Sequence, residues 1–136
     1  MEKVLFICTK NSARSQIAEG LINHDLGERV QAYSAGIEPS SVHPMAVKVM
    51  EELGIDISHQ RSKGLEEFAD QKFDYVITLC SQANKACPVF FGGTLKLHMD
   101  FPNPAAFEGP DEEKVAKYRE VRGKIEQEIK KWLKNQ

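Results

Sequence analysis

The sequence predicts an α/β fold in which helices cover both faces of a parallel β-sheet. Short apolar segments alternate along the chain with longer segments whose apolar residues recur at helical spacing. The first apolar segment, Val4 to Cys8, is continuous, as expected of a strand buried on both faces. Alternation of this kind implies right-handed crossover connections between neighbouring parallel strands.

Four strands are expected, over residues 3–8, 30–34, 74–79 and 94–98. The first helix is expected over residues 12–26, where apolar residues share one face and Gly27 acts as a stop signal. A second helix is expected over residues 44–53, with Pro44 at its start and Gly54 after its end. A short helix is expected over residues 64–68. The apolar face of the first helix holds Ile17, Ala18, Leu21 and Ile22.

The last helix begins at Pro110, which is followed by three acidic residues. Proline and acidic side chains both suit a helix N-terminus, because proline fixes the backbone angle and the helix dipole favours negative charge there. Apolar residues continue at helical spacing to the end of the chain. They are Val115, Tyr118, Val121, Ile125, Ile129 and Trp132.

Length and composition limit the function. The 136 residues fit a single domain, 1–136, and the net charge of -2 gives no strong field for nucleic acid or an anionic membrane. The longest apolar run is far shorter than the roughly 20 residues that span a bilayer, and it does not resemble a signal peptide. We therefore expect a soluble, cytoplasmic protein, with monomer as the default state and no nucleic-acid or membrane partner.

Two of the three cysteines directly follow predicted strands: Cys8 follows the first strand and Cys80 the third. The carboxyl ends of parallel strands meet at one edge of the sheet, where active sites of such folds lie. If the two strands are neighbours, both sulfur atoms lie at that edge. An odd number of cysteines in a reducing compartment favours thiol chemistry or buried thiols over structural disulfides.

The segment from Cys8 to Ser15 joins a buried strand to a helix and has the pattern C-x5-R-S. Backbone N–H groups of such a loop form a cradle for a tetrahedral oxyanion. Arg14 adds a bidentate, permanently charged fork, and the same positive potential favours the thiolate form of Cys8. The Ser15 hydroxyl can donate to that thiolate. The predicted oxyanion-binding residues are Thr9, Lys10, Asn11, Ser12, Ala13 and Arg14.

Individual residues of this loop have specific expected roles. Asn11 tolerates a left-handed backbone, which a tight loop requires. The Lys10 side chain is expected to point to solvent, although it could add charge to the anion site. The alternative interpretation is a buried structural cysteine with Arg14 solvated on a helix, but the strand, the helix and the following serine all agree with the anion loop.

The motif VLFICTKNSARSQIAEG closely resembles the phosphate-binding loop of the low-molecular-weight tyrosine phosphatase superfamily. Within it, the chain resembles the thioredoxin-coupled arsenate reductases nearly end to end, through AYSAGIEPSSVHPMAVKVMEELGIDISHQRSK, DYVITLCSQANKACP and HMDFPNPA. The resemblance implies a three-layer fold with a four-stranded parallel sheet of order 2-1-3-4 flanked by helices. That order makes the first and third strands neighbours.

The resemblance also implies a redox relay. Cys8 would attack arsenate, Cys80 would attack the Cys8 sulfur and release arsenite, and Cys87 would then move the disulfide to Cys80–Cys87 for an external dithiol, thioredoxin by preference. Cys80 and Cys87 could instead be incidental thiols. Metal binding is a poor interpretation of their spacing, and the four histidines add no ligand pattern. Phosphate or sulfate would mimic arsenate, and no cofactor is expected.

Two departures from the family pattern affect the site. The general acid of the family precedes Pro-Ala, where this chain has Asn103, and an amide cannot supply a carboxylic proton. Asp100 could substitute, and Ala105 stands where the phosphatases place a tyrosine.

Some related reductases hold potassium near the loop, through residues matching Asn11, Glu19, Ser34 and an acidic side chain. Lys63 occupies that acidic position, so its ammonium would replace the metal and none is expected; the alternative is a plain surface lysine.

The sequence is compatible with three functions. Arsenate reduction uses all three cysteines. A low-molecular-weight protein tyrosine phosphatase would need only Cys8 and Arg14, but the missing acid argues against it. The third possibility is an anion-binding or redox-sensing module in which Cys8 and Cys80 form a regulatory disulfide.

Overall fold

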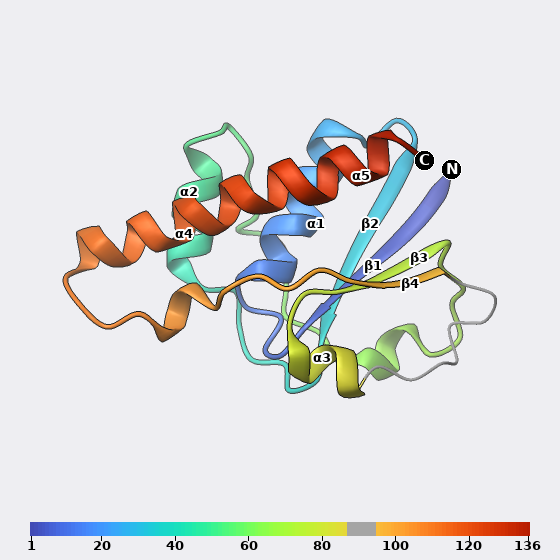
Figure 1. Cartoon of the computed structure of the whole chain (residues 1–136), viewed down its shortest axis with the longest axis horizontal. Helices are drawn as coiled ribbons and strands as arrows, with labels where there is room; N and C mark the ends of the chain where they lie inside the picture. The colour runs from blue at the N-terminus through green and yellow to red at the C-terminus, as the bar shows by residue number, and fades with distance from the viewer. Residues whose placement is uncertain (87–94) are drawn as a thin grey trace.

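The computed structural model describes residues 1–86 and 95–136, and within them it has the predicted parallel sheet. The four strands are β1 (Glu2–Cys8), β2 (Val30–Gly36), β3 (Tyr75–Thr78) and β4 (Leu95–His98). They are all parallel and lie in the order β2-β1-β3-β4, which confirms the order that the resemblance implied. The strands run from the end that holds both termini toward the loops beside α3 (Figure 1).

The predicted helices occur in the expected order with shifted ends, and two short helical segments on either side of the last strand occur in addition. They are α1 (Arg14–Asp25), α2 (Pro44–Glu51), α3 (Ser81–Ala86), α4 (Asp111–Ile125) and α5 (Lys131–Lys134), with 3₁₀ turns η1 (Leu65–Phe68) and η2 (Pro104–Ala106) and a π-helical segment η3 (Glu126–Lys130). Helix α1 begins two residues later than expected, because residues 9–13 form a loop at the carboxyl end of β1. Strand β2 is two residues longer than expected and pairs with all of β1.

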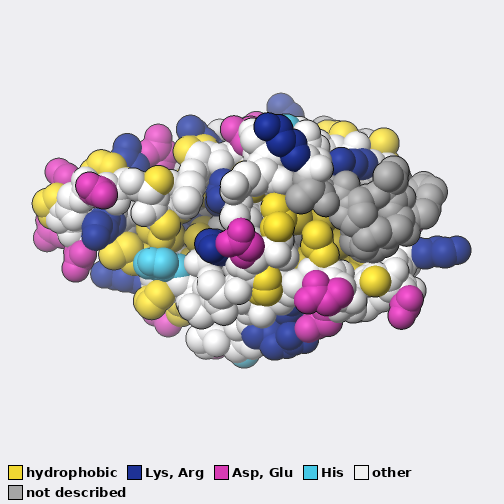
Figure 2. All heavy atoms as spheres, turned by 90° about the horizontal axis from the view of Figure 1, so that it is seen from below, with side chains coloured by type: hydrophobic (Ala, Val, Ile, Leu, Met, Phe, Trp, Pro, Cys, Tyr) yellow, Lys and Arg dark blue, Asp and Glu magenta, His cyan; other side chains and the backbone are white. Residues whose placement is uncertain are grey.

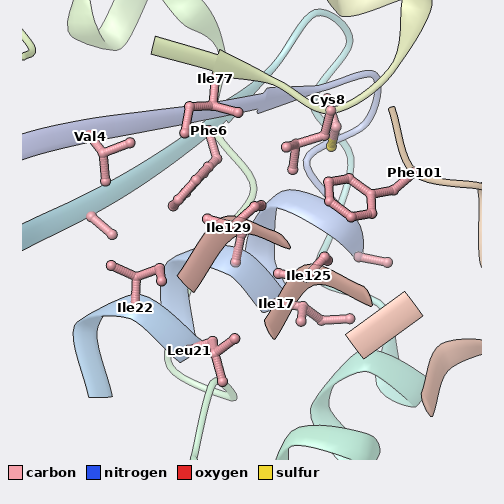
Figure 3. Packing of buried hydrophobic residues seen from close by; sticks show 14 of the residues in the cluster. Val4, Phe6, Cys8, Ile17, Leu21, Ile22, Ile77, Phe101, Ile125 and Ile129 are labelled. Atoms are coloured by element: carbon pink, nitrogen blue, oxygen red, sulfur yellow. The ribbon is translucent and has the colours of Figure 1, made fainter. Parts of the chain in front are cut away.

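The core lies mainly between the sheet and the helices α1 and α4. Val4 and Phe6 of β1 face Ile17 and Ile22 of α1, and Ile125 and Ile129 pack beside them (Figure 3). The five residues of the continuous apolar run in β1 are almost completely buried, as expected for the strand between β2 and β3. The opposite face of the sheet is covered by an edge-to-face aromatic cluster of Tyr33, Phe68 and Phe73, with ring centroids 5.6–5.8 Å apart.

The C-terminal helix departs from the predicted apolar stripe at its end. Leu133 is buried, whereas Trp132 is only partly buried and packs edge-to-face on Tyr75 with ring centroids 5.1 Å apart. The buried residues from Val121 onward are spaced by four, which slightly exceeds one α-helical turn. The wider π-helical turn of η3 keeps this face on the core. No helix in the described ranges is long and apolar enough to cross a membrane.

Candidate active site

The loop between β1 and α1 surrounds the sulfur of Cys8. Cys8 is 2% exposed and is the last residue of the central strand β1, so its position is fixed by the sheet. The Sγ atom lies 2.9 Å from the Oγ of Ser15 and accepts the backbone N–H of Asn11 at 3.2 Å. The Ser15 hydroxyl already accepts the Asn11 side-chain amide at 2.7 Å, so its own proton is available for the sulfur. This arrangement stabilises a negative charge on Cys8.

Asn11 holds the loop in its tight conformation. Its φ angle is 51°, in the left-handed region that the sequence analysis expected it to tolerate. Its side chain is fully buried and also accepts the backbone N–H of Lys63 at 2.8 Å. Gly36 of β2 lies against it so closely that a Cβ atom there would be 2.8 Å from the Asn11 nitrogen. The loop therefore depends on a glycine in a neighbouring strand.

A buried glutamine of α1, Gln16, holds the anion loop in place, although no sequence pattern pointed to it. The Gln16 amide of α1 donates to the carbonyl of Asn11 at 3.0 Å and to that of Arg61 at 2.9 Å. Gln60 in turn donates to the Gln16 side chain at 2.8 Å. Gln16 thus fastens the anion loop to the segment after α2. No local pattern predicts this role, because two of the partners, Gln60 and Arg61, are 44 and 45 positions away along the chain.

Arg14 is the first residue of α1 and turns toward the same space as Cys8. Its side chain donates from Nη1 to the carbonyl of Phe101 at 3.2 Å, which fixes the guanidinium against the loop after β4. Ala13 precedes the helix and provides no side-chain cap. The first N–H groups of a helix have no intrahelical partners and attract negative charge. The guanidinium and the helix N-terminus therefore both favour an anion at this position.

A cavity of about 480 Å³ opens beside the loop. It lies at the carboxyl ends of the strands, the edge of the molecule that faces the viewer in Figure 2. Both described cysteines contribute to its wall, as the strand order predicted. Its lining consists of Cys8, Thr9, Lys10, Ser12, Ala13, Arg14, Cys80, Ser81, Gln82, Asn103 and Ala105.

Cys80 follows β3 and precedes α3, and it is 7% exposed. Its Sγ atom accepts the backbone N–H of Ala83 at 3.4 Å and lies 3.2 Å from the Oγ1 of Thr9. The Thr9 hydroxyl also donates to the Oε1 of Gln82 at 3.1 Å. No local sequence pattern predicts this link between the anion loop and Cys80. The third predicted redox residue, Cys87, lies outside the described residues.

The Lys10 side chain is exposed, as expected, and it also contacts a neighbouring acidic residue. Its side chain is 55% exposed, but it also lines the cavity, and its ammonium donates to the Oε2 of Glu38 at 2.8 Å. The exposure of Lys10 was expected, whereas its contact with Glu38 was not. The reason is the segment after β2, which runs alongside the loop and places Glu38 next to it.

Lys63 is not a plain surface lysine. Its side chain is 10% exposed, and its ammonium lies 3.5 Å from the Oε1 of Glu19, whose side chain is 14% exposed. The same carboxylate oxygen accepts the Ser34 hydroxyl at 2.6 Å. The Lys63 backbone N–H also donates to the Asn11 side chain, so this ion pair lies next to the anion loop.

Asn103 and Ala105 line the cavity, whereas Asp100 does not belong to its lining. The Asn103 side chain accepts the backbone N–H of Ala105 at 3.1 Å and so caps η2. The Asp100 side chain is 63% exposed and lies 3.8 Å from the Nε2 of His98. The structure thus brings the amide, and not the expected substitute carboxyl, to the site.

His43 caps the N-terminus of α2. Its Nδ1 accepts the backbone N–H of Met45 at 3.1 Å, and its own backbone N–H donates to the carbonyl of Ser12 at 3.0 Å. Burial, together with the nearby charge of Lys114, lowers the pKa of His43, which suits an imidazole that must accept a hydrogen bond. His43 thereby connects α2 to the anion loop.

Comparison with protein families identifies one matching model, low molecular weight phosphotyrosine protein phosphatase, over residues 3–136. An arsenate reductase of Halalkalibacterium halodurans is 47% identical over 127 residues, which cover 93% of this chain and 91% of that protein. The residues matched by the family model include the anion loop and the segment around Cys80.

Solved structures agree with this similarity. An arsenate reductase in the phosphate-binding state has a TM-score of 0.80 and 36% identity, covering 99% of this chain and 98% of that one. A thioredoxin-dependent arsenate reductase of Corynebacterium glutamicum has a TM-score of 0.72 and 32% identity, covering all of this chain and 64% of that one.

Proposed function

This chain belongs to the low molecular weight phosphotyrosine protein phosphatase family, and we infer that it is an arsenate reductase. The observation that carries this conclusion is the shared cavity. Cys8 and Cys80 both line it, together with Arg14, and the hydrogen bonds around Cys8 favour its thiolate. A hydrolytic phosphatase needs the first cysteine and the arginine but has no use for a second thiol in the same wall.

The first step forms a covalent adduct. The Cys8 thiolate attacks the arsenic of arsenate while Arg14 and the loop N–H groups neutralise its oxygens. A sulfur–arsenic bond forms, and a hydroxyl group of the arsenate takes up one proton and leaves as water. Arsenic remains pentavalent in this adduct. No electrons have yet moved from protein to substrate, so a further thiol is required for reduction.

The second step reduces the arsenic. The Cys80 thiolate attacks the Sγ of Cys8, and the electron pair of the sulfur–arsenic bond passes to arsenic, which leaves as trivalent arsenite. A Cys8–Cys80 disulfide remains. In the third step the Cys87 thiolate attacks Cys80, which releases Cys8 as a thiolate and leaves a Cys80–Cys87 disulfide. An external dithiol reduces that bond and regenerates the enzyme.

The protein itself needs no further cofactor for these steps, and we propose thioredoxin as the dithiol. The similar arsenate reductase of Corynebacterium glutamicum is thioredoxin-dependent. A relay that ends on Cys80–Cys87 supports this choice, because it moves the disulfide away from the nearly buried Cys8. We further propose that the enzyme acts as a monomer in the cytoplasm, where thiols are kept reduced.

Phosphatase activity is the weaker alternative. Phosphoester hydrolysis requires an acid for the leaving oxygen, and Asn103 stands at the cavity where the family places that acid. A role for Asp100 as the acid would need its carboxyl to turn from His98 toward the cavity. A redox-sensing module without turnover would also be consistent with two thiols in one wall, and the assay below distinguishes it.

Paired assays on one reduced preparation test the proposal. Arsenite production with thioredoxin, thioredoxin reductase and NADPH is compared with hydrolysis of an aryl phosphate. We expect turnover in the first assay and little in the second. Turnover in the aryl phosphate assay alone would establish a phosphatase, and turnover in neither would favour the sensor.

Four variants assign the residues. Cys8→Ser and Arg14→Lys should abolish both activities, since a hydroxyl stays protonated at neutral pH and one ammonium cannot replace a bidentate fork. Cys80→Ser and Cys87→Ser should abolish arsenite turnover but leave any weak phosphatase activity. Mass mapping of Cys87→Ser after arsenate treatment should find Cys8 bonded to Cys80. A free Cys8 in that experiment would contradict the order of the relay.

A further inference from the structure

The segment after β2 lies along the anion loop and brings a negative charge to it. The backbone N–H of Glu38 donates to the carbonyl of Thr9 at 2.9 Å, and that of Ser40 donates to the carbonyl of Lys10 at 3.2 Å. The Ser62 hydroxyl donates to the same Lys10 carbonyl at 2.8 Å. The backbones of Lys10 and Glu38 are therefore held next to each other, and only their side chains are free to move.

Those side chains form an exposed ion pair at the edge of the cavity. The Lys10 ammonium lies 2.8 Å from the Glu38 carboxylate, and the side chains are 55% and 68% exposed. The hydrogen bond from Lys10 lowers the pKa of Glu38, so the carboxylate is ionised at neutral pH. Exposed pairs of this kind are weak, because water and salt screen both charges. A stronger anion nearby competes readily for the ammonium.

Lys10 also lines the cavity that holds Cys8 and Arg14. Its long side chain and its position within the anion loop allow the ammonium to reach either Glu38 or an oxyanion. We propose that Lys10 exchanges its ammonium between Glu38 and the bound oxyanion, so that Glu38 sets the affinity of the site for dianionic tetrahedral oxyanions. The inference rests on the proposed function only in taking the cavity as the oxyanion site.

The ion pair then has a definite effect on binding. In the free enzyme Glu38 holds the ammonium, and an incoming oxyanion has to displace that carboxylate. The occupied state gains the Lys10 interaction but loses the Lys10–Glu38 pair. Glu38 therefore lowers oxyanion affinity through Lys10, and this coupling distinguishes the exchange from simple repulsion by a nearby negative charge.

A double-mutant cycle measures that coupling. Inorganic phosphate is titrated by calorimetry into the reduced wild type, Glu38→Gln, Lys10→Met and the double variant, and each variant's thermal unfolding confirms its fold. Glu38→Gln should bind phosphate about threefold more tightly, in keeping with an exposed ion pair. Lys10→Met should bind less tightly than the wild type, and Glu38→Gln should add nothing in the Lys10→Met background.

A control separates this effect from net charge. Glu120→Gln removes the same charge from another exposed pair, with Lys117 on α4, which does not belong to the cavity lining. It should leave phosphate affinity unchanged. Three results would each overturn the proposal. Glu38→Gln could raise phosphate affinity equally with Lys10 and with Met at position 10. Glu120→Gln could raise phosphate affinity as much as Glu38→Gln does, or Glu38→Gln could leave it unchanged. Failure of arsenite production by the wild type would instead refute the proposed function, while phosphate affinities would still report on the exchange.

Discussion

The hydroxyl of Thr9 lies 3.2 Å from the sulfur of Cys80, although the two residues are 71 positions apart in the sequence. Thr9 belongs to the anion loop and Cys80 follows a neighbouring strand, so this contact connects the binding of the oxyanion to the second thiol. The hydroxyl has a single proton, which it now donates to Gln82. If Cys80 ionises, the same proton can turn to the sulfur and stabilise the thiolate.

Thr9→Val should therefore slow the attack of Cys80 on the Cys8 adduct. We expect a loss of about tenfold, comparable to one hydrogen bond to a charged group. Single-turnover arsenite release measures this step without thioredoxin. Thr9→Ser retains the hydroxyl and is the matched control. Arsenite release from Thr9→Val at the wild-type rate would show that the hydroxyl does not assist Cys80.

Oxidation should unwind α3. If the helix continued to Cys87, Cys80 and Cys87 would be separated by about two turns, roughly 10 Å along the axis, whereas a disulfide requires Cα atoms within about 7 Å. A helix as short as Ser81–Ala86 is marginal by itself, so a redox step can drive its unwinding. Amide hydrogen exchange should show protection of residues 81–86 in the reduced protein and its loss after arsenate oxidation. Equal protection in both states would refute the unwinding and leave the thiol chemistry untouched.

Asn103→Asp should raise aryl phosphate hydrolysis. Aspartate caps a helix as well as asparagine does, so the contact with the Ala105 N–H and the fold should survive. The new carboxyl supplies a general acid, which typically contributes about 10²-fold or more, and activity should fall above the pKa of that carboxyl. Asp100→Asn is the companion variant. Loss of arsenite turnover in Asp100→Asn would show that Asp100 is the acid. If Asn103→Asp does not raise aryl phosphate hydrolysis, position 103 has no part in proton delivery.

Lys63→Met should destabilise the protein by about 3 kcal/mol, because it leaves the nearly buried Glu19 carboxylate without its cation. If the Lys63 ammonium takes the place of a bound potassium ion, as proposed from the sequence, the wild type should unfold at the same temperature in KCl and NaCl. Potassium should partly rescue Lys63→Met. Thermal unfolding in the two salts measures both effects, and marked stabilisation of the wild type by potassium would show that Lys63 does not replace the ion.

Glu52→Gln should destabilise the fold in a pH-dependent manner. Glu52 follows α2 and accepts hydrogen bonds from Arg119 at 2.7 Å and Arg122 at 2.8 Å, and these bonds lower its pKa from 4.5 to about 2. A lowered pKa means that the stabilisation is complete above pH 4.5 and is lost as the pH falls toward 2. Urea unfolding should give the wild type a larger free energy of unfolding than Glu52→Gln at pH 7, and this difference should narrow below pH 4.5. A difference independent of pH would contradict the charge-based explanation.

Local chemistry determined much of this protein. The continuous apolar run of β1, the helical spacing of Ile17 and Leu21, and the C-x5-R-S pattern each describe neighbouring residues, whose backbone and burial preferences are set by short-range physics. The positions of Cys8 and Cys80 at the carboxyl ends of their strands followed from the same reasoning. Asn11 could be expected to adopt a left-handed backbone because its side chain tolerates that conformation.

Only the tertiary structure decided which distant groups meet. Gln16 supports the loop because the segment after α2 returns to it, and Lys10 contacts Glu38 because β2 lies beside β1. The exposed position of Asp100 likewise depends on the path of the chain after β4. Hydrogen bonds and ion pairs of this kind are individually weak and short-ranged, so they form only where the packed core has already placed their partners.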